Sequence, residues 1–172
     1  MASESQNISS IDPEASSSPA EHSADQGARP RQPHPGRELS SLWYALMIRP
    51  WTTLGVVCPD DPQRAWRLVQ TLVQTSGLPP ESIRAVSVLD ASAERAAAIS
   101  HAVNPKKVKA SGQRVVLATD SPLVNPVAIR VLGSCDAVLL LVDQGRSVIP
   151  DARRTLDLIG PERVLGAVFV QE

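Results

Sequence analysis

The sequence predicts an α/β fold of three layers, in which helices cover both faces of a central, mostly parallel sheet of five strands. Short apolar runs rich in β-branched residues alternate with longer segments whose apolar residues recur at helical spacing, and this alternation is typical of βαβ units. The run Ala137–Val142 is apolar at every position, as in a strand that is buried on both faces. With 42% hydrophobic residues, the chain can also build a core.

Five runs have the length and composition of strands. Each is five to seven residues long and rich in aliphatic or β-branched residues. The predicted strands are Thr52–Val57, Ile83–Leu89, Arg114–Ala118, Ala137–Val142 and Val164–Val170. Because helical segments separate them, we expect consecutive strands to be parallel.

The first two helices are predicted from apolar stripes with recognisable ends. Four residues recur at helical spacing in the segment Glu38–Ile48, and Pro50 stops that run. These residues are Leu39, Leu42, Trp43 and Leu46. In the next helix, Asp61 offers an N-cap, Pro62 takes the first helical position and Gly77 ends the pattern.

Three further helices are predicted between the later strands. Ala91–Val103 is rich in alanine and ends before Pro105. Asn125 followed by Pro126 repeats the combination of cap and proline, and opens a helix that reaches residue 132. The last helix, Ile149–Ile159, leads into the fifth strand.

The first 37 residues differ in composition from the remainder. They hold eight serines and five prolines and no aromatic residue. Such a segment buries too little apolar surface to offset the entropy lost on ordering. We therefore expect a disordered Ser/Pro-rich tail over residues 1–37 and one α/β domain over residues 38–172.

Charge and cysteine content exclude several classes of protein. The 17 basic and 18 acidic residues are nearly balanced, which argues against a general nucleic-acid-binding protein. The longest apolar run has six residues, whereas a membrane helix needs about 20. Two cysteines, Cys58 and Cys135, are too few for the disulfide framework of a small secreted protein, so the chain is expected to be cytoplasmic. The two cysteines are expected at opposite ends of the parallel strands and therefore unpaired.

Three segments in the second half of the chain form a recognisable set: Val115–Pro126, Cys135–Gly145 and Arg163–Phe169. Together they resemble the C-terminal half of the bacterial tyrosine autokinases of capsule and exopolysaccharide synthesis, a branch of the ParA/MinD-like P-loop ATPases. In that family one strand ends in Asp-x-Pro-Pro, and two later strands carry the patterns aDgvllVv and vlGvVlN. The resemblance extends over residues 38–170 and implies a P-loop NTPase-like fold.

The resemblance also implies a phosphate loop after the first strand, and the chain departs from the family there. In the loop motif G-x-x-x-x-G-K-[ST], backbone N–H groups and the lysine side chain point at the phosphates and bind them. This chain has Cys58-Pro59-Asp60-Asp61-Pro62 in that place. The two prolines remove N–H donors, and the two carboxylates repel a phosphate. We therefore expect no nucleotide binding, no cofactor and no enzymatic activity.

Two further acids follow predicted strands, where ligands of parallel sheets usually bind. Asp90 and Asp120 fall at positions where the resemblance implies acidic residues of the family's motifs. They could ligate magnesium, or they could be loop acids and helix caps. Because the phosphate loop is missing, the second interpretation is favoured. Asp60, Asp61, Asp90 and Asp120 are accordingly expected to form a degenerate site that holds no metal.

The first predicted helix is the candidate for binding a partner. The family motif Glu-x-x-Arg-x-x-Arg, implicated in ring assembly, keeps Glu38 here but lacks both arginines. Trp43, Tyr44, Trp51 and Trp66 are four of the five aromatic residues. They either pack in the core or expose an aromatic patch, which is typical of interfaces. The partner-binding candidates are therefore Glu38, Trp43, Tyr44 and Trp51.

The resemblance implies a non-catalytic accessory or regulatory protein of exopolysaccharide biosynthesis or export. Its expected partner is the cytoplasmic face of a membrane polysaccharide copolymerase or chain-length protein, or a related active ATPase. Such a partner would recruit it to the inner membrane. The alternatives are a weak ATPase or kinase with a non-standard phosphate site, and a positioning accessory of the ParA/MinD type. The basic run 106–109 is interpreted as a solvated loop, or as a contact for anionic lipid or an acidic partner.

Overall fold

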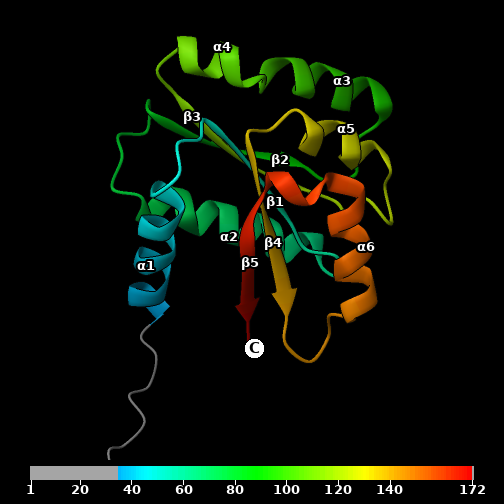
Figure 1. The fold of residues 1–172 in the computed structure, drawn as a ribbon. Helices are drawn as coiled ribbons and strands as arrows, with labels where there is room; N and C mark the ends of the chain where they lie inside the picture. Colours follow the sequence, from blue (N-terminus) through cyan, green and yellow to red (C-terminus); the bar gives the residue numbers. More distant parts are fainter. Residues whose placement is uncertain (1–34, 172) are drawn as a thin grey trace, which may run out of the picture. The chain divides into compact units, whose positions relative to one another are not determined.

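The structure, a computed structural model, describes residues 35–171. The tail predicted for residues 1–37 lies outside the described residues, except for its last three positions. Residues 35–171 form five strands and six α-helices in three layers, which confirms the predicted fold class (Figure 1).

All five predicted strands are present, and each lies within one residue of its predicted bounds. They are β1 (Thr53–Val57), β2 (Ile83–Val88), β3 (Arg114–Thr119), β4 (Ala137–Asp143) and β5 (Val164–Val170). The order across the sheet is β2-β3-β1-β4-β5, and every neighbouring pair is parallel. The central position of β1 explains why all five of its residues are buried.

The helices follow the prediction with one addition. They are α1 (Pro35–Met47), α2 (Pro62–Thr75), α3 (Ala93–Ala102), α4 (Pro105–Ala110), α5 (Val127–Gly133) and α6 (Ile149–Ile159), and a short 3₁₀ turn, η1 (Pro161–Arg163), precedes β5. The addition is α4, which contains the basic run that the sequence placed in a loop. Asn104 caps it through Lys106 N–H at 3.1 Å, and Pro105 occupies its first turn.

The helices are divided between the two faces of the sheet. On one face, α1 and α2 pack against the sheet, and on the other face lie α3, α4, α5 and α6 (Figure 1). Large buried residues of the first core include Trp43, Leu54, Leu72, Val116 and Leu139. Those of the second face include Val57, Val115, Leu117, Leu132 and Leu140. Alternate residues of β1 therefore contribute to opposite cores.

A glycine in β1 allows α5 to pack closely on the sheet. A Cβ atom built at Gly55 would lie 2.6 Å from Leu132 Cδ2 and 3.5 Å from Cys135 Sγ. The first distance is too short for any side chain, so a larger residue would require the Leu132 side chain or α5 itself to move. Gly55 thereby allows Leu132 to pack directly on the central strand.

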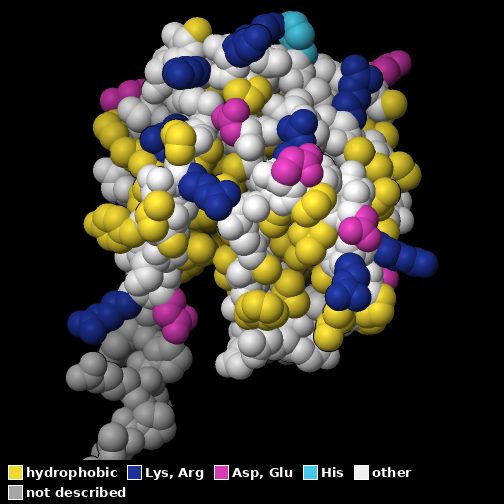
Figure 2. All heavy atoms as spheres, viewed as in Figure 1, with side chains coloured by type: hydrophobic (Ala, Val, Ile, Leu, Met, Phe, Trp, Pro, Cys, Tyr) yellow, Lys and Arg dark blue, Asp and Glu magenta, His cyan; other side chains and the backbone are white. Residues whose placement is uncertain are grey.

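One edge of the sheet is apolar and open. β5 pairs with β4 on one side, and its residues Gly166, Ala167 and Phe169 are exposed. Figure 2 shows hydrophobic side chains over β5 and α6. In the described part of the chain, no helix combines the length and the apolar character that crossing a membrane requires.

Candidate functional site

The loops after β1, β2 and β3 meet at the carboxyl ends of the strands, where the sequence placed the degenerate site. They surround a cavity of about 340 Å³, called here the carboxyl-edge cavity. Its lining residues are Pro59, Asp60, Pro62, Asp90, Asp120, Ser121, Val124 and Asn125. The structure therefore brings three of the four predicted acids to one cavity, and the fourth, Asp61, follows Asp60 in the chain.

Asp61 occupies the N-terminus of α2 with its own carboxylate. Its Oδ1 accepts hydrogen bonds from the backbone N–H groups of Gln63 at 2.9 Å and Arg64 at 3.2 Å. Arg64 N–H also donates to Asp61 O at 3.1 Å, and the helix dipole makes both N–H groups attractive to an anion. The predicted N-cap is thus confirmed. In this fold the same N–H groups could otherwise contact a phosphate.

The cation nearest to this helix end is engaged by carboxylates. Arg64 Nη1 lies 2.7 Å from Asp143 Oδ2, and Arg64 Nε lies 3.5 Å from Asp61 Oδ2. Asp143, the last residue of β4, is only 1% exposed, so this ion pair compensates a carboxylate that is removed from water. Arg67 reaches Asp61 at 3.5 Å from the next turn of α2. Both arginines therefore neutralise acids that belong to the protein itself.

Asp120 ties together the loops that follow β2 and β3. Its Oδ2 accepts hydrogen bonds from Asp90 N–H at 2.8 Å and from Asn125 Nδ2 at 3.0 Å. Asp90 has a φ of 51°, in the left-handed region that aspartate tolerates better than most residues. These contacts support the interpretation of Asp120 as a structural loop acid. Within residues 35–171, no group of three or more His, Cys, Asp or Glu residues could hold a metal ion.

Asp60 connects the first loop to the loop after β4. Its Oδ2 accepts a hydrogen bond from Ser147 Oγ, and Ser147 Oγ in turn accepts one from Asp143 N–H at 2.8 Å. The roles of Asp143, Ser147 and Arg64 could not be read from the sequence. Only the general rule that ligands bind beyond the carboxyl ends of parallel strands applies to the loop after β4.

The structure corrects two of the four partner-binding candidates. Trp43 and Trp51 are 5% and 4% exposed, and their rings meet edge to face with centroids 5.9 Å apart. Trp51 Nε1 also donates a hydrogen bond to Leu46 O at 2.9 Å, which satisfies its buried N–H. Both tryptophans are core residues, because α1 turns its apolar stripe with Trp43 toward the sheet and Trp51 packs against Trp43.

The other two candidates lie on the opposite side of α1. Tyr44 is 74% exposed, and Glu38 is exposed as well. Ile48, which the sequence did not single out, is 82% exposed directly after the helix. Tyr44 and Ile48 therefore form an exposed apolar pair, called here the α1 surface.

Both cysteines are buried and free, as predicted. Burial raises the pKa of the Cys58 thiol, and it raises the pKa of the Cys135 thiol to about 12. The reactive thiolate is therefore suppressed at both positions, and neither cysteine is a candidate nucleophile.

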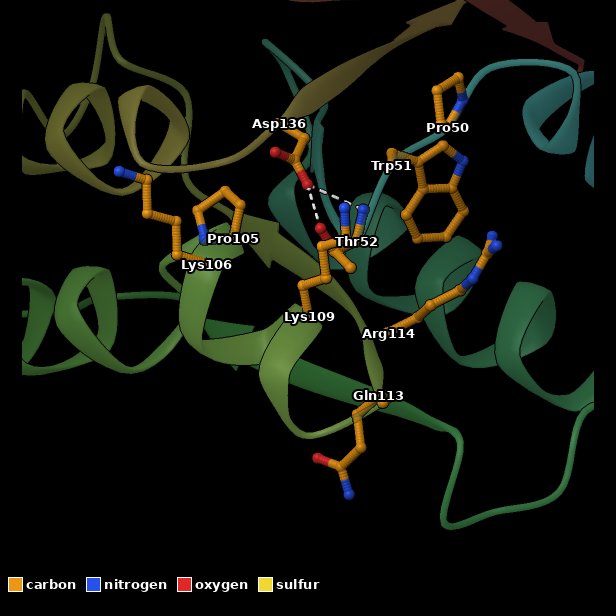
Figure 3. A pocket seen from close by; sticks show the side chains of 10 residues that line it. Pro50, Trp51, Thr52, Pro105, Lys106, Lys109, Gln113, Arg114 and Asp136 are labelled. Atoms are coloured by element: carbon orange, nitrogen blue, oxygen red, sulfur yellow. Dashed lines mark hydrogen bonds between the residues drawn. The ribbon is translucent and has the colours of Figure 1, made fainter.

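A second cavity, of about 580 Å³, lies at the amino ends of the strands (Figure 3). We call it the amino-edge pocket. Its lining residues are Pro50, Trp51, Thr52, Pro105, Lys106, Lys109, Gly112, Gln113, Arg114 and Asp136. It lies at the opposite end of the strands from the carboxyl-edge cavity, and the resemblance to the autokinases implies no role for it.

The chain was compared with protein-family models, with curated proteins and with solved structures, and none of them matches it.

Proposed function

We propose that this domain is a non-catalytic accessory or regulatory protein of exopolysaccharide biosynthesis or export, derived from a tyrosine autokinase that has lost nucleotide binding. The observation that carries the loss of nucleotide binding is the occupation of the α2 N-terminus by the Asp61 carboxylate. The assignment to exopolysaccharide rests on the resemblance of residues 115–169 to the autokinases.

Electrostatics at the carboxyl-edge cavity support a binding protein over an ATPase. A phosphate placed at the start of α2 would meet the carboxylates of Asp60 and Asp61. Two like charges about 4 Å apart cost about 4 kcal/mol near a protein surface. Pro59 and Pro62 offer no N–H donor, and Arg64 is held by Asp143 and Asp61. The cavity therefore opposes the binding of a polyphosphate.

The α1 surface is the part of the domain best suited to bind a protein partner. Tyr44 and Ile48 are exposed on or directly after this helix, and aromatic residues are enriched at interfaces. The proposed partner is the cytoplasmic segment of a membrane polysaccharide copolymerase or chain-length protein, or an active ATPase of related fold. Binding to such a partner would bring the domain to the inner membrane.

The decisive test measures ATP hydrolysis and thermal unfolding of the purified protein with millimolar MgATP. A ligand at 100 times its dissociation constant adds about 2.7 kcal/mol of stability, which raises the melting temperature by several degrees. We expect no hydrolysis of ATP, and no increase in melting temperature from MgATP bound in the carboxyl-edge cavity. Turnover of ATP would contradict the proposal and favour the weak ATPase or kinase.

The partner is tested with Tyr44→Ala combined with Ile48→Ala, and with Arg153→Ala on the exposed side of α6 as the control. The double variant should fold normally but bind the copolymerase segment from the same genome less tightly, whereas the control should bind as the wild type does. Equal binding by all three proteins would remove the α1 surface from the proposal. If the gene for this protein does not lie beside genes for glycosyltransferases and export proteins, the alternative of a ParA/MinD-type positioning accessory would be favoured.

A further inference from the structure

The amino-edge pocket brings together side chains from four separate segments of the chain. Pro50, Trp51 and Thr52 precede β1, and Pro105, Lys106 and Lys109 belong to α4. Arg114 begins β3, and Asp136 lies directly before β4. Its volume of about 580 Å³ falls within the usual range of small-molecule sites. These segments meet because all strands are parallel, so that the residues directly before each strand lie at the same edge of the sheet.

Among the residues that the structure describes, the lysines of this pocket have no acidic partner. Within residues 35–171, no carboxylate forms an ion pair with Lys106 or Lys109. Their neighbour Lys107 points elsewhere, since its Nζ contacts the His101 ring. Figure 3 shows Lys109 extending from α4 toward Thr52. Lys109 therefore presents an exposed ammonium group to the cavity, and no carboxylate of the described residues forms an ion pair with it, whereas the Lys106 ammonium points away from Asp136 and Arg114.

Arg114 adds a fixed positive charge to the wall of the pocket. Its guanidinium carbon lies 5.0 Å from the centroid of the Trp51 ring, within the range of a cation–π contact. Its Nη1 donates to Met47 Sδ at 2.7 Å. These contacts fix the position of the guanidinium but use few of its five N–H donors. The others remain suited to an anionic ligand.

Asp136 provides an ionised acceptor beside these cations. Its Oδ2 accepts hydrogen bonds from Thr52 N–H at 2.8 Å, from Thr52 Oγ1 and from Thr53 N–H at 3.1 Å (Figure 3). Within the described residues, no donor contacts Oδ1. Burial alone would raise the pKa of Asp136, but these hydrogen bonds outweigh burial and hold the pKa below its ordinary value. Oδ1 is thus a charged acceptor available to a ligand.

The charges at the two ends of the sheet differ in sign. The carboxyl-edge cavity contains Asp60, Asp90 and Asp120 and no lysine or arginine, whereas the amino-edge pocket contains three cations and one carboxylate. Figure 2 shows Lys and Arg side chains gathered around α4. An anion is therefore attracted to the amino edge and repelled from the carboxyl edge.

We propose that the amino-edge pocket binds a phosphate monoester that also carries hydroxyl groups, such as a sugar phosphate, either free or as a lipid headgroup. Lys109, which extends toward Thr52 in Figure 3, binds the phosphate, and Lys106 and Arg114, whose charged ends point to other sides of the pocket, attract it at longer range. A hydroxyl group of the ligand donates to Asp136 Oδ1, which would repel a ligand that presented only anionic oxygens there. The proposal concerns a different edge of the sheet and does not depend on the proposed function.

The test is a calorimetric titration of the full-length protein with glucose 1-phosphate at low ionic strength. Inorganic phosphate and glucose serve as the two partial ligands, and vesicles containing phosphatidylinositol 4-phosphate test the lipid source. We expect saturable binding of glucose 1-phosphate that is tighter than binding of either partial ligand. Binding of the vesicles but not of glucose 1-phosphate would support the same site with a lipid headgroup as its source.

Matched variants on α4 locate the site. Lys109→Ala should weaken binding at least tenfold, because a charged hydrogen bond contributes about 1.5–3 kcal/mol. Lys107→Ala removes the same charge from the same helix outside the pocket and should change affinity less than threefold. Equal loss in both variants would indicate unspecific attraction to the basic surface and overturn the proposal. The proposal would also be overturned if none of the phosphate ligands bound.

The same variants separate this inference from the proposed function. ATP also carries phosphates, so it could stabilise the protein through the amino-edge pocket. Stabilisation by MgATP that is lost in Lys109→Ala would support the pocket and leave the proposed function intact. Stabilisation that persists in Lys109→Ala would come from elsewhere, and it would contradict the loss of nucleotide binding at the carboxyl edge.

Discussion

Trp43 and Tyr44 are adjacent in α1 but have opposite environments, and this predicts opposite effects of substitution. Trp43 is buried against Trp51, whereas Tyr44 is exposed. Trp43→Ala should lower the free energy of unfolding by about 3–5 kcal/mol, because it removes a large side chain from a packed core. Tyr44→Ala should change it by less than about 0.5 kcal/mol. Urea unfolding of the two variants measures both effects, and equal losses of stability would contradict the assignment of Trp43 to the core.

A pH-dependent contribution to stability is expected from Asp136. Hydrogen bonds from Thr52 and Thr53 hold its pKa in the folded protein below its ordinary value, which is about 3.9 in an unfolded chain. The contribution is therefore complete above the unfolded-state pKa and is lost as the pH falls through the folded-state pKa. Asp136→Asn should be less stable than the wild type near neutral pH, and the difference should shrink below about pH 4.

The measurement is the free energy of unfolding of both proteins over the acidic range. Other carboxylates titrate in the same range, so the difference between wild type and variant carries the information. Asp157→Asn, on the exposed side of α6, is the control for loss of a surface charge. A stability difference for Asp136→Asn that stayed constant from neutral to strongly acidic pH would refute the predicted linkage.

At the scale of elements, the N-cap of α2 is the feature with the clearest consequence for stability. Asp61 accepts two backbone hydrogen bonds at the start of this helix. Asp61→Ala should cost about 1 kcal/mol of unfolding free energy, because it leaves these N–H groups without their side-chain acceptor. Asp61→Asn keeps an acceptor oxygen and should lose less. Chemical denaturation compares the two variants, and a loss in Asp61→Asn as large as that in Asp61→Ala would indicate that charge, not capping, matters.

The strands could be predicted from the sequence because each is a short apolar run, as expected for a sheet that helices cover on both faces. The burial of Trp43 is favoured by the helical spacing that it shares with Leu42 and Leu46 and that Tyr44 does not share, but the cluster of aromatic residues made Trp43 a partner-binding candidate instead. The burial of Trp51 could not be predicted, because it depends on how the chain folds back against α1 and on a contact with Arg114, which is distant in sequence.

Helix α4 and the contacts of the candidate site could not be predicted from the sequence, for two different physical reasons. Asn104 and Pro105 repeat the cap and proline that predicted two other helices, but the six-residue helix has too short an apolar stripe to be recognised. The pairing of Asp90 with Asp120 and of Arg64 with Asp143 depends on which strands are neighbours. Local patterns predict strands but do not determine their order in the sheet.

At the scale of the whole domain, the parallel sheet separates two chemical environments. Every strand begins at one edge and ends at the other, so the loops before the strands and the loops after them form separate surfaces. In this chain the first surface carries Lys106, Lys109 and Arg114, and the second carries Asp60, Asp90 and Asp120. Because the charges are spread over distant parts of the chain, their balance in the overall composition conceals this polarity.

The strand order also has a consequence for the synthesis of the protein. β2 pairs with β3, and β1 lies between β3 and β4, so neither of the first two strands has its native partner until residues 114–119 leave the ribosome. Until then the nascent chain exposes β1, all five of whose residues are destined for the interior. Contacts between distant segments form slowly, and exposed apolar strands favour aggregation. The insertion of β3 between β1 and β2 is thus the step at which the central strand gains its first native neighbour, and β4 covers its other edge later.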